Sequence, residues 1–387
     1  MRTIQIKLIA STLCHCAGFV AAHGETKSDL GPEFGFEFVT VGDVGNIGYP
    51  GGLGIPLTGR GAVDYQFRVS RTEISGGQWI QFVNKFGTVS DELGDMLRTG
   101  GWSAYRDPQY NGPGQRYVFS AAPLYPERAP VGVSWRQAAM FCNWMHNGCT
   151  DDPDSLMDGA YDVSTFTRNE DNSYNDQDTH HPGARYWIVT LDEYLKAVYY
   201  DPDKNGEGPG WWEFGHSSDE PPVYGMPGVG HVARELSDEQ YIELTGGPSH
   251  SNIPLGIYTN AQSPWGLLDV LGGETDFVED WEPKGYRHAR ARKYASDGSF
   301  FDDFRGDRVW NLQWILPRQD GGFRIASLPR SAADLDRNWK VDWFDVSYFL
   351  ERYLADDLAV DLNADQVLDG NDVWVFLGLF EAAHADG

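Results

Sequence analysis

Oxygen-bearing side chains recur at fixed spacing near the carboxyl end of the chain. Five carboxylates or amides at loop positions 1, 3, 5, 9 and 12, with a backbone carbonyl at position 7, form a first series: Asp334, Asp336, Asn338, Asp342, Asp345 and, at position 7, Lys340. The series begins again 27 residues later with Asp361, Asn363, Asp365, Asp369, Asp372 and, at position 7, Val367. Ca²⁺ takes six to eight oxygen ligands, and this spacing delivers them from one turning loop. The pattern therefore predicts two calcium sites, each holding one ion.

An apolar, helix-like run follows each loop, at residues 346–350 and 373–377. A repeat of ligands and helix together is far more specific than one loop, whereas the alternative, a solvated acidic tail, needs no apolar helices. Loop position 6 normally requires a left-handed glycine. Here it holds Trp339 and Gln366, and a non-glycine residue in that conformation costs about 1–2 kcal/mol. Modest calcium affinity is expected.

Three helices upstream are indicated by capping boxes, in which a hydroxyl residue is followed by Gln or Glu three positions later. They are Ser75 with Gln78, Ser134 with Gln137, and Thr190 with Glu193. Short strand-like runs lie at 65–69 and 185–189, and long loops rich in Gly, Pro and Asp fill 151–183 and 201–230. The histidine pair at 180–181 falls in such a loop, and we expect it to be exposed.

The composition restricts the classes of partner. A formal net charge of −27 excludes nucleic acid, because a phosphate backbone needs a basic surface. Residues 1–24 resemble a bacterial-type signal peptide, with a basic start, a short apolar stretch and small residues at the cleavage site. No segment is long enough to span a bilayer. A secreted or periplasmic location is expected, in which Cys142 and Cys149 are separate thiols, because seven positions along a helix is too far for a bridge.

Residues 34–328 resemble the formylglycine-generating enzyme family, also called sulfatase-modifying factors. Five motifs in the family's order carry the resemblance: residues 65–75, 130–144 (PVGVSWRQAAMFCNW), 187–194, 263–281 and 321–326 (GGFRIA). The resemblance implies an α+β domain with a C-type-lectin-like formylglycine-generating-enzyme fold.

The chain differs from that family at the positions that supply the family's metal ligands. The family's oxidases bind copper(I) through a Cys pair near the C-terminus, and soft thiolates suit that metal. The corresponding stretch, 285–324, contains no Cys, so copper is not expected. Cys142 matches the helical "F-C-N-W" position and is expected to be structural. In the stretch that supplies the family's calcium ligands, Gly273 and Asp276 replace Asn and Glu.

Residues 332–387 resemble a dockerin, a small all-α calcium module. The resemblance covers the two loops and their helices and implies a cohesin-like protein partner on an extracellular scaffold. Residues 331–387 carry 13 acidic and 3 basic side chains. We therefore expect that removing calcium unfolds this segment, because its like charges would be uncompensated.

Two functions for the main domain remain open. One is a ligand- or protein-binding module without oxidase chemistry, which the missing Cys pair favours. The other is an oxidoreductase of the same family with a non-standard metal site, built around Trp265, Asp269, Asp276, Glu279 and Arg287. The sequence assigns no catalytic residue and no ligand for this domain.

Overall fold

The computed structural model of the chain describes two compact units. One ends at Leu328 and is here called the large unit; the other begins at Pro329 and is called the C-terminal unit. The described residues are 32–51, 58–99, 104–121, 124–167, 169–170, 175–177, 179–233, 235–246, 252–272, 275–281, 287–290, 310–311, 321–336 and 340–384. The predicted signal peptide, residues 1–24, lies outside them.

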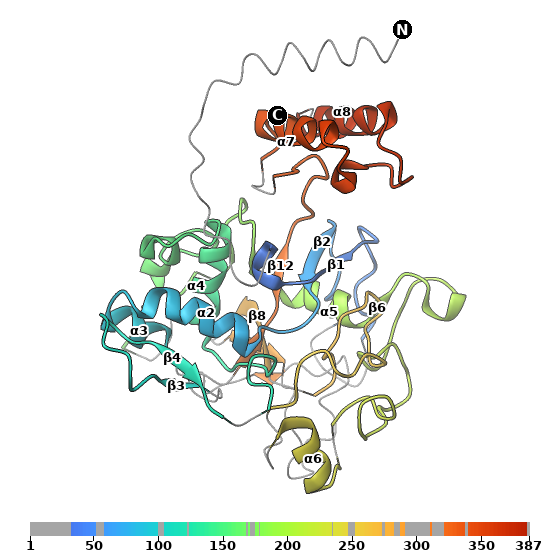
Figure 1. The fold of residues 1–387 in the computed structure, drawn as a ribbon. Helices are drawn as coiled ribbons and strands as arrows, with labels where there is room; N and C mark the ends of the chain where they lie inside the picture. Colours follow the sequence, from blue (N-terminus) through green and yellow to red (C-terminus); the bar gives the residue numbers. More distant parts are fainter. Residues whose placement is uncertain are drawn as a thin grey trace. The chain divides into compact units, whose positions relative to one another are not determined.

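A four-stranded sheet joins the beginning and the end of the large unit. Strand β1 (Phe38–Val41) pairs antiparallel with β2 (Phe67–Ser70), and Phe38 faces Ser70. Strand β12 (Ile325–Ser327) lies between β2 and β5 (Trp187–Ile188), antiparallel to both. Strands far apart in sequence thus become neighbours (Figure 1). Closing such pairs costs loop entropy, which the buried apolar side chains of the strands offset.

A second sheet has the order β10-β9-β8-β11 and carries the longest strand, β8 (Thr275–Trp281). Strand β8 pairs parallel with β11 (Gly321–Phe323) and antiparallel with β9 (Arg287–Arg290), which pairs with β10 (Trp310–Asn311). Two hairpin-like pairs complete the set: β3 (Ala104–Arg106) with β4 (Tyr117–Phe119), and β6 (Tyr200–Asp201) with β7 (Gly210–Trp211).

The capping boxes place the helices as the sequence predicts. Helix α2 (Gly76–Gly87) is capped by Ser75, α4 (Trp135–His146) by Ser134, and α5 (Leu191–Tyr199) by Thr190, each reciprocally with its Gln or Glu. A further capping box, Ser237 with Gln240, begins α6 (Asp238–Thr245). Helix α3 (Asp91–Leu97) follows α2, and short 3₁₀ turns lie at Pro32–Gly35, Pro153–Leu156, Val163–Thr165 and Lys204–Gly206.

Aromatic rings fill the core between α2 and α4, which lie side by side (Figure 1). The ring of Phe82 on α2 is 4.9 Å from that of Phe141 and 5.1 Å from that of Trp144, both on α4. Phe323 of β11 contacts Phe141 at 5.8 Å, so the helices pack onto the sheet. Large rings bury much apolar area per residue, which allows a domain with so many loops to hold a core.

The C-terminal unit is helical. Helix α7 (Trp343–Leu354) and helix α8 (Gly370–His384) flank a short 3₁₀ turn at Leu358–Val360. Phe349 of α7 stacks on Phe376 of α8 with centroids 4.6 Å apart and planes at 8°, and Ala333 and Val360 are buried beside them. These two phenylalanines stand 27 residues apart, the same interval as the loops.

The described residues contain seven α-helices and several small sheets, which is a mixed α+β architecture as the sequence predicts. None of their helices is long and apolar enough to cross a membrane.

Candidate metal centre

The first predicted loop gathers three carboxylates. Single oxygens of Asp334, Asp336 and Asp345 all lie within 4.8 Å of one another. Asp334 and Asp345 are buried, whereas Asp336 is exposed. Placing several carboxylates together away from water is unfavourable unless a cation compensates them. The set consists of hard oxygen donors, so it suits Ca²⁺ better than a metal that prefers nitrogen or sulfur.

Asp345 is held in place by the start of α7. It forms a capping box with the N-cap residue Asp342 and accepts hydrogen bonds from the backbone N–H of Asp342 (2.8 Å), Leu335 (2.7 Å) and Asp336 (3.1 Å). The carboxylate at position 12 therefore joins the first turn of the helix to the beginning of the loop. Its rotamer is fixed in advance, which lowers the cost of ordering it around an ion.

The second loop repeats this arrangement. Asp372, which is 0% exposed, accepts from the backbone N–H of Leu362 (2.9 Å), Asn363 (3.4 Å) and Asp369 (2.8 Å). These donors stand 27 residues after those of Asp345, so each bond of the first loop has a counterpart. The internal repeat in the sequence is thus also a repeat of hydrogen-bond geometry.

The second loop has a left-handed backbone conformation at position 6. Gln366 has a φ of 65°, in the left-handed region that glycine normally supplies. Both oxygens of Asp361 stabilise the turn, since Oδ1 accepts from the N–H of Asp365 (3.3 Å) and Oδ2 from that of Gln366 (2.7 Å). The predicted strain is therefore present here. Trp339, its counterpart in the first loop, lies outside the described residues.

The two loops differ in how they gather ligands. Within the part of the chain that the structure describes, the first loop is the one place where three acidic ligands lie within 4.8 Å. In the second, position 3 is Asn363, whose side-chain amide donates to Asp365 Oδ2 at 3.0 Å. An amide offers one acceptor oxygen instead of two. The first loop has its one asparagine at position 5 instead, so each loop has four aspartates and one asparagine among its predicted side-chain ligands.

The aspartate at position 9 of each loop also caps the helix that follows, which its spacing alone does not indicate. Asp342 accepts from the N–H of Phe344 (2.8 Å), and Asp369 accepts from that of Asn371 (2.7 Å), so both aspartates satisfy orphan donors at a helix N-terminus. In loops of this type position 9 often reaches the metal through a water. Of the remaining predicted ligands, Lys340 is exposed, Val367 is 56% exposed, and Asn338 lies outside the described residues.

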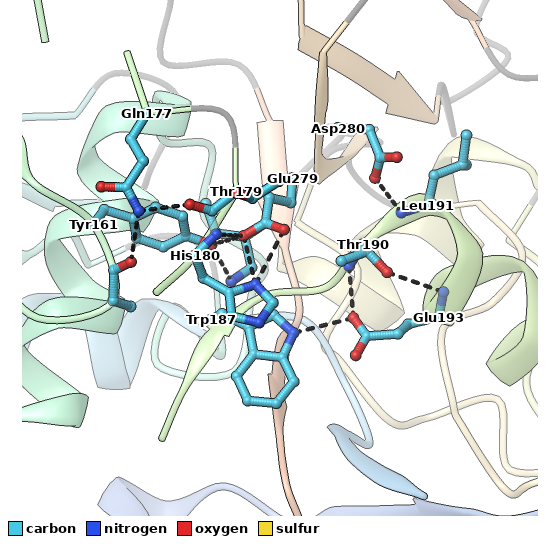
Figure 2. A network of polar contacts seen from close by, with 12 residues as sticks. Tyr161, Gln177, Thr179, His180, Trp187, Thr190, Leu191, Glu193, Glu279 and Asp280 are labelled. Carbon is cyan, nitrogen blue, oxygen red and sulfur yellow. Dashed lines mark hydrogen bonds and ion pairs between the residues drawn. The ribbon is translucent and has the colours of Figure 1, made fainter. Parts of the chain in front are cut away.

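The large unit contains a buried polar network centred on Glu279 of β8, shown in Figure 2. Glu279 is 2% exposed, and its Oε1 accepts from the hydroxyl of Tyr161 (2.7 Å) and from the backbone N–H of His180 (2.8 Å). The His180 ring contacts both carboxylate oxygens, with Nδ1 at 2.8 and 3.1 Å. The prediction that residues 180–181 are exposed is therefore wrong for His180, whose side chain is 20% exposed, while His181 is exposed.

His180 was missed because nothing in its neighbouring residues indicates burial. Its ring stacks on Trp187 at 4.4 Å with planes at 14°, and its charged partner is Glu279 of β8, 99 residues further along the chain. Burial alone would lower the pKa of His180, but the hydrogen bond and charge of Glu279, with the charge of Glu193, outweigh it and raise that pKa. The two buried carboxylates thus favour the protonated form of the ring.

Glu193 forms the second half of the network. Fully buried on α5, it accepts from the Tyr65 hydroxyl (2.9 Å), the indole N–H of Trp187 (3.1 Å) and the backbone N–H of Thr190 (2.8 Å). Burial raises the pKa of this carboxyl, and these donors oppose the rise. The Thr190 bond is part of the capping box of α5, whereas the bonds from Trp187 and Tyr65 join α5 to β5 and to the chain before β2.

Four of the five residues proposed for a non-standard oxidase site are engaged in structural contacts. The indole N–H of Trp265 donates to the carbonyl of Tyr200 (2.9 Å), and Asp269 accepts from the N–H of Gly256 (2.9 Å). Asp276 pairs with Arg324 at 3.5 Å, and both are 0% exposed. Glu279 belongs to the network above, and the side chain of Arg287 lies outside the described residues.

Arg324 explains why Asp276 is buried. Its guanidinium donates to the carbonyls of Arg71 (2.8 Å) and Leu268 (2.8 Å) as well as facing Asp276. A buried cation with carbonyl acceptors and one carboxylate is satisfied, whereas either charge alone would be costly. The pair thus links the junction of β11 and β12 to strand β8.

Among the described residues, Cys142 and Cys149 are free thiols, as the sequence predicts. Cys142 is fully buried on α4, and burial raises its thiol pKa well above the usual value; burial raises that of Cys149 to about 12. Neither thiol is therefore disposed to form the thiolate that binds a soft metal. The stretch 291–309, together with 312–320, lies outside the described residues.

Comparison with known proteins gives little further guidance. No family model matches the chain, and no curated protein matches it. Similar solved structures include Treponema denticola variable protein 1, with 13% identity, coverage of 76% of this chain and 95% of that one, and a TM-score of 0.43. The crystal structure of CarF has 16% identity, 76% and 99% coverage, and a TM-score of 0.41. These likenesses are distant, and the two family resemblances stay predictions.

Proposed function

We propose that this chain is a secreted binding protein that attaches to an extracellular assembly through a calcium-dependent, dockerin-like C-terminal unit. In this proposal the large unit, a formylglycine-generating-enzyme-like domain, binds a ligand or protein and does not oxidise it. The observation that carries the proposal is the matched pair of loops, in which Asp345 and Asp372 accept the same three backbone hydrogen bonds. A repeat of that kind organises two ion sites around one small core.

The surface of the C-terminal unit supports a protein partner. Trp343 is 68% exposed, Phe344 61% and Trp374 69%. Large aromatic side chains on the surface of so small a unit are unfavourable in water and are typical of residues that anchor a protein interface. Because Trp343 and Phe344 lie within the last positions of the first loop and Trp374 lies two residues after the second, loss of calcium would disturb them.

Among the described residues, no contact favours the alternative of an oxidoreductase. Asp269, Asp276 and Glu279 already bind backbone, arginine and histidine partners. A catalytic metal needs several protein ligands and one coordination position left open for water or substrate.

The proposal is tested by calcium titration calorimetry of the full chain. We expect two ions per chain, and one ion for Asp345→Asn or Asp372→Asn. The control is Glu351→Gln, which removes the same charge from an exposed position of α7 outside both loops. Two ions should remain in that variant. Finding no calcium bound at millimolar concentration would refute the proposal.

The partner is tested with immobilised cohesin domains. We expect binding of the full chain to at least one cohesin in calcium, and its loss on adding EGTA. Trp374→Ala should weaken the interaction while leaving two calcium ions bound. Calcium binding without any cohesin binding would retain the metal sites and reject the docking function.

A further inference from the structure

A pocket of about 450 Å³ lies on the large unit between residues 47–51 and the β6–β7 hairpin. This volume lies within the range of small-ligand sites. Its lining combines aromatic and acidic side chains, namely Tyr49, Tyr200, Trp211, Trp212, Glu213 and Asp219. The calcium loops and the Glu279 network contribute none of the residues that line it.

Trp211 is fixed in the wall of this pocket. Its indole N–H donates to the carbonyl of Ile47 (3.2 Å), and Tyr49 and Tyr200 approach its ring with centroids at 5.6 and 5.3 Å. A Cβ at Gly61 would come within 2.3 Å of the Trp211 ring, so only a glycine leaves room for the indole in this position. A ring held in advance loses little entropy when a ligand stacks on it.

A cation of the chain itself, the ammonium group of Lys204, already lies beside the Trp212 ring. Lys204 Nζ lies 4.6 Å from the centroid of the Trp212 ring, 2.8 Å from the carbonyl of Trp211 and 2.7 Å from Asp219 Oδ2. A site that binds an organic cation on an aromatic ring needs both the ring face and the nearby carboxylate to be available to the ligand. Lys204 uses both, so the pocket favours a neutral ligand.

The remaining polar groups favour a ligand rich in O–H donors. The indole N–H groups of Trp211 and Trp212 are committed to Ile47 and to Asp201 Oδ2 (3.0 Å), so neither is left to donate to a ligand. Glu213 and Asp219 contribute carboxylates, which accept hydrogen bonds only. Asp219 already accepts from Lys204 and from the N–H of Glu213, but a carboxylate has about four lone-pair sites and can accept further bonds. A proline-rich peptide presents carbonyl acceptors and binds grooves whose aromatic residues donate to them, which is the opposite pattern.

We propose that this pocket binds a neutral saccharide. The C–H face of a pyranose ring packs against Trp211 and Tyr49, and its hydroxyl groups donate to Glu213 and Asp219. This inference rests on the proposed role of the large unit as a binding domain, and it names the place and the chemical class of the ligand.

The test measures binding of neutral hexasaccharides to the full chain in calcium, by calorimetry and saturation-transfer NMR. The probes are β-1,4-linked hexamers of glucose, xylose and mannose and an α-1,4-linked glucose hexamer. We expect at least one to bind, and Tyr49→Ala to weaken that binding roughly tenfold through lost ring contact. Tyr105→Ala is the matched control, because Tyr105 is 50% exposed and lies outside the pocket.

A second matched pair tests the hydrogen bonds. Glu213→Gln should weaken binding of the same hexamer, and Glu220→Gln, an exposed neighbour outside the lining, should not. Both variants keep the shape of the side chain, so they test recognition even where removal of a ring would disturb folding. Equal binding by Glu213→Gln and Glu220→Gln would contradict the proposed hydroxyl contact.

Three results would overturn the inference. They are no binding of any hexamer at about 10 mM, binding unaffected by Tyr49→Ala, and binding of a deca-proline peptide or of N-acetyl-lysine methylamide instead. Failure here is distinguishable from failure of the docking function. EGTA should abolish cohesin binding and leave saccharide binding intact, since the pocket lies wholly within the large unit.

Discussion

Glu279 illustrates how a single buried charge shapes its surroundings in this protein. The carboxylate lies at 2% exposure and is compensated by a tyrosine hydroxyl, a backbone N–H and the imidazole of His180. Removing any one donor would leave a buried charge partly unsatisfied, which costs about 1–3 kcal/mol. The network therefore acts as a clamp between β8 and the loop that carries His180.

This clamp gives a pH dependence with a definite sign. The pKa of His180 is raised above its ordinary value of 6.5, so the folded state binds the proton more tightly than the unfolded chain. The stabilisation is fully present below pH 6.5 and is lost as pH rises through the higher, folded-state pKa. We expect the melting temperature of the large unit to exceed that of His180→Gln most at pH 5.5 and least at pH 8.5.

Calorimetric melting scans across that range measure the difference. His181→Gln is the matched control, because His181 is the exposed neighbour. It should change the melting temperature little at any pH. A difference between wild type and His180→Gln that stays constant or grows with pH would show that the imidazolium does not stabilise the fold.

At the scale of elements, each predicted calcium loop and the helix behind it form one structural unit. The capping box of Asp342 with Asp345 starts α7, and the same Asp345 closes the loop by accepting from Leu335 and Asp336. Helix initiation and ligand placement thus depend on one carboxylate. A strained turn at Gln366 lies in the second of these units, with a φ of 65°.

Relieving that strain should tighten calcium binding. Gln366→Gly removes a left-handed cost of about 1–2 kcal/mol and loses part of it to the greater freedom of glycine in the unfolded chain. The expected net gain is about 1 kcal/mol, or roughly fivefold in apparent affinity, because folding is coupled to binding. Calcium titration would measure it.

Gln366→Ala provides the comparison for this substitution. Alanine loses the same side-chain atoms beyond Cβ but keeps the Cβ that opposes a positive φ. Its calcium affinity should match that of wild type. Equal affinities of the glycine and alanine variants would mean that the turn carries no strain.

At the scale of the whole molecule, charge and hydrophobic core are distributed unequally. The large unit holds a wide aromatic core, whereas the described part of the C-terminal unit has a cluster of four buried apolar residues, Ala333, Phe349, Val360 and Phe376, with partly buried apolar side chains packed against it. Residues 331–387 carry a net charge of −10. That core is small against such repulsion, so we expect ion binding to contribute to folding.

Chelation should therefore unfold one unit and spare the other. With EGTA we expect the far-UV circular dichroism of α7 and α8 to disappear, and the melting transition of the large unit to stay unchanged. Asp345→Asn combined with Asp372→Asn should reproduce the spectrum in calcium. A spectrum indifferent to EGTA would show that the C-terminal unit folds without ions.

How much of this could be predicted depends on the range of the interactions. Capping boxes and loop ligands lie within twelve residues of one another, so their spacing predicted the helices from Ser75, Ser134 and Thr190 and placed Asp334, Asp336 and Asp345 together. The buried position of His180 was not predictable, because its partner Glu279 is 99 residues away. The pocket walls at Tyr49 and Trp211 were missed for the same reason.

The sequence by itself determined the local features: where helices begin, which oxygens recur at calcium spacing, and that two thiols stay apart. These depend on hydrogen bonds and periodicity within a few turns of chain. Only the tertiary structure decided which charges are buried and compensated, as with Asp276 beside Arg324, and which rings meet across a pocket. Burial is a property of the assembled chain, because a residue loses its water only when distant segments pack against it.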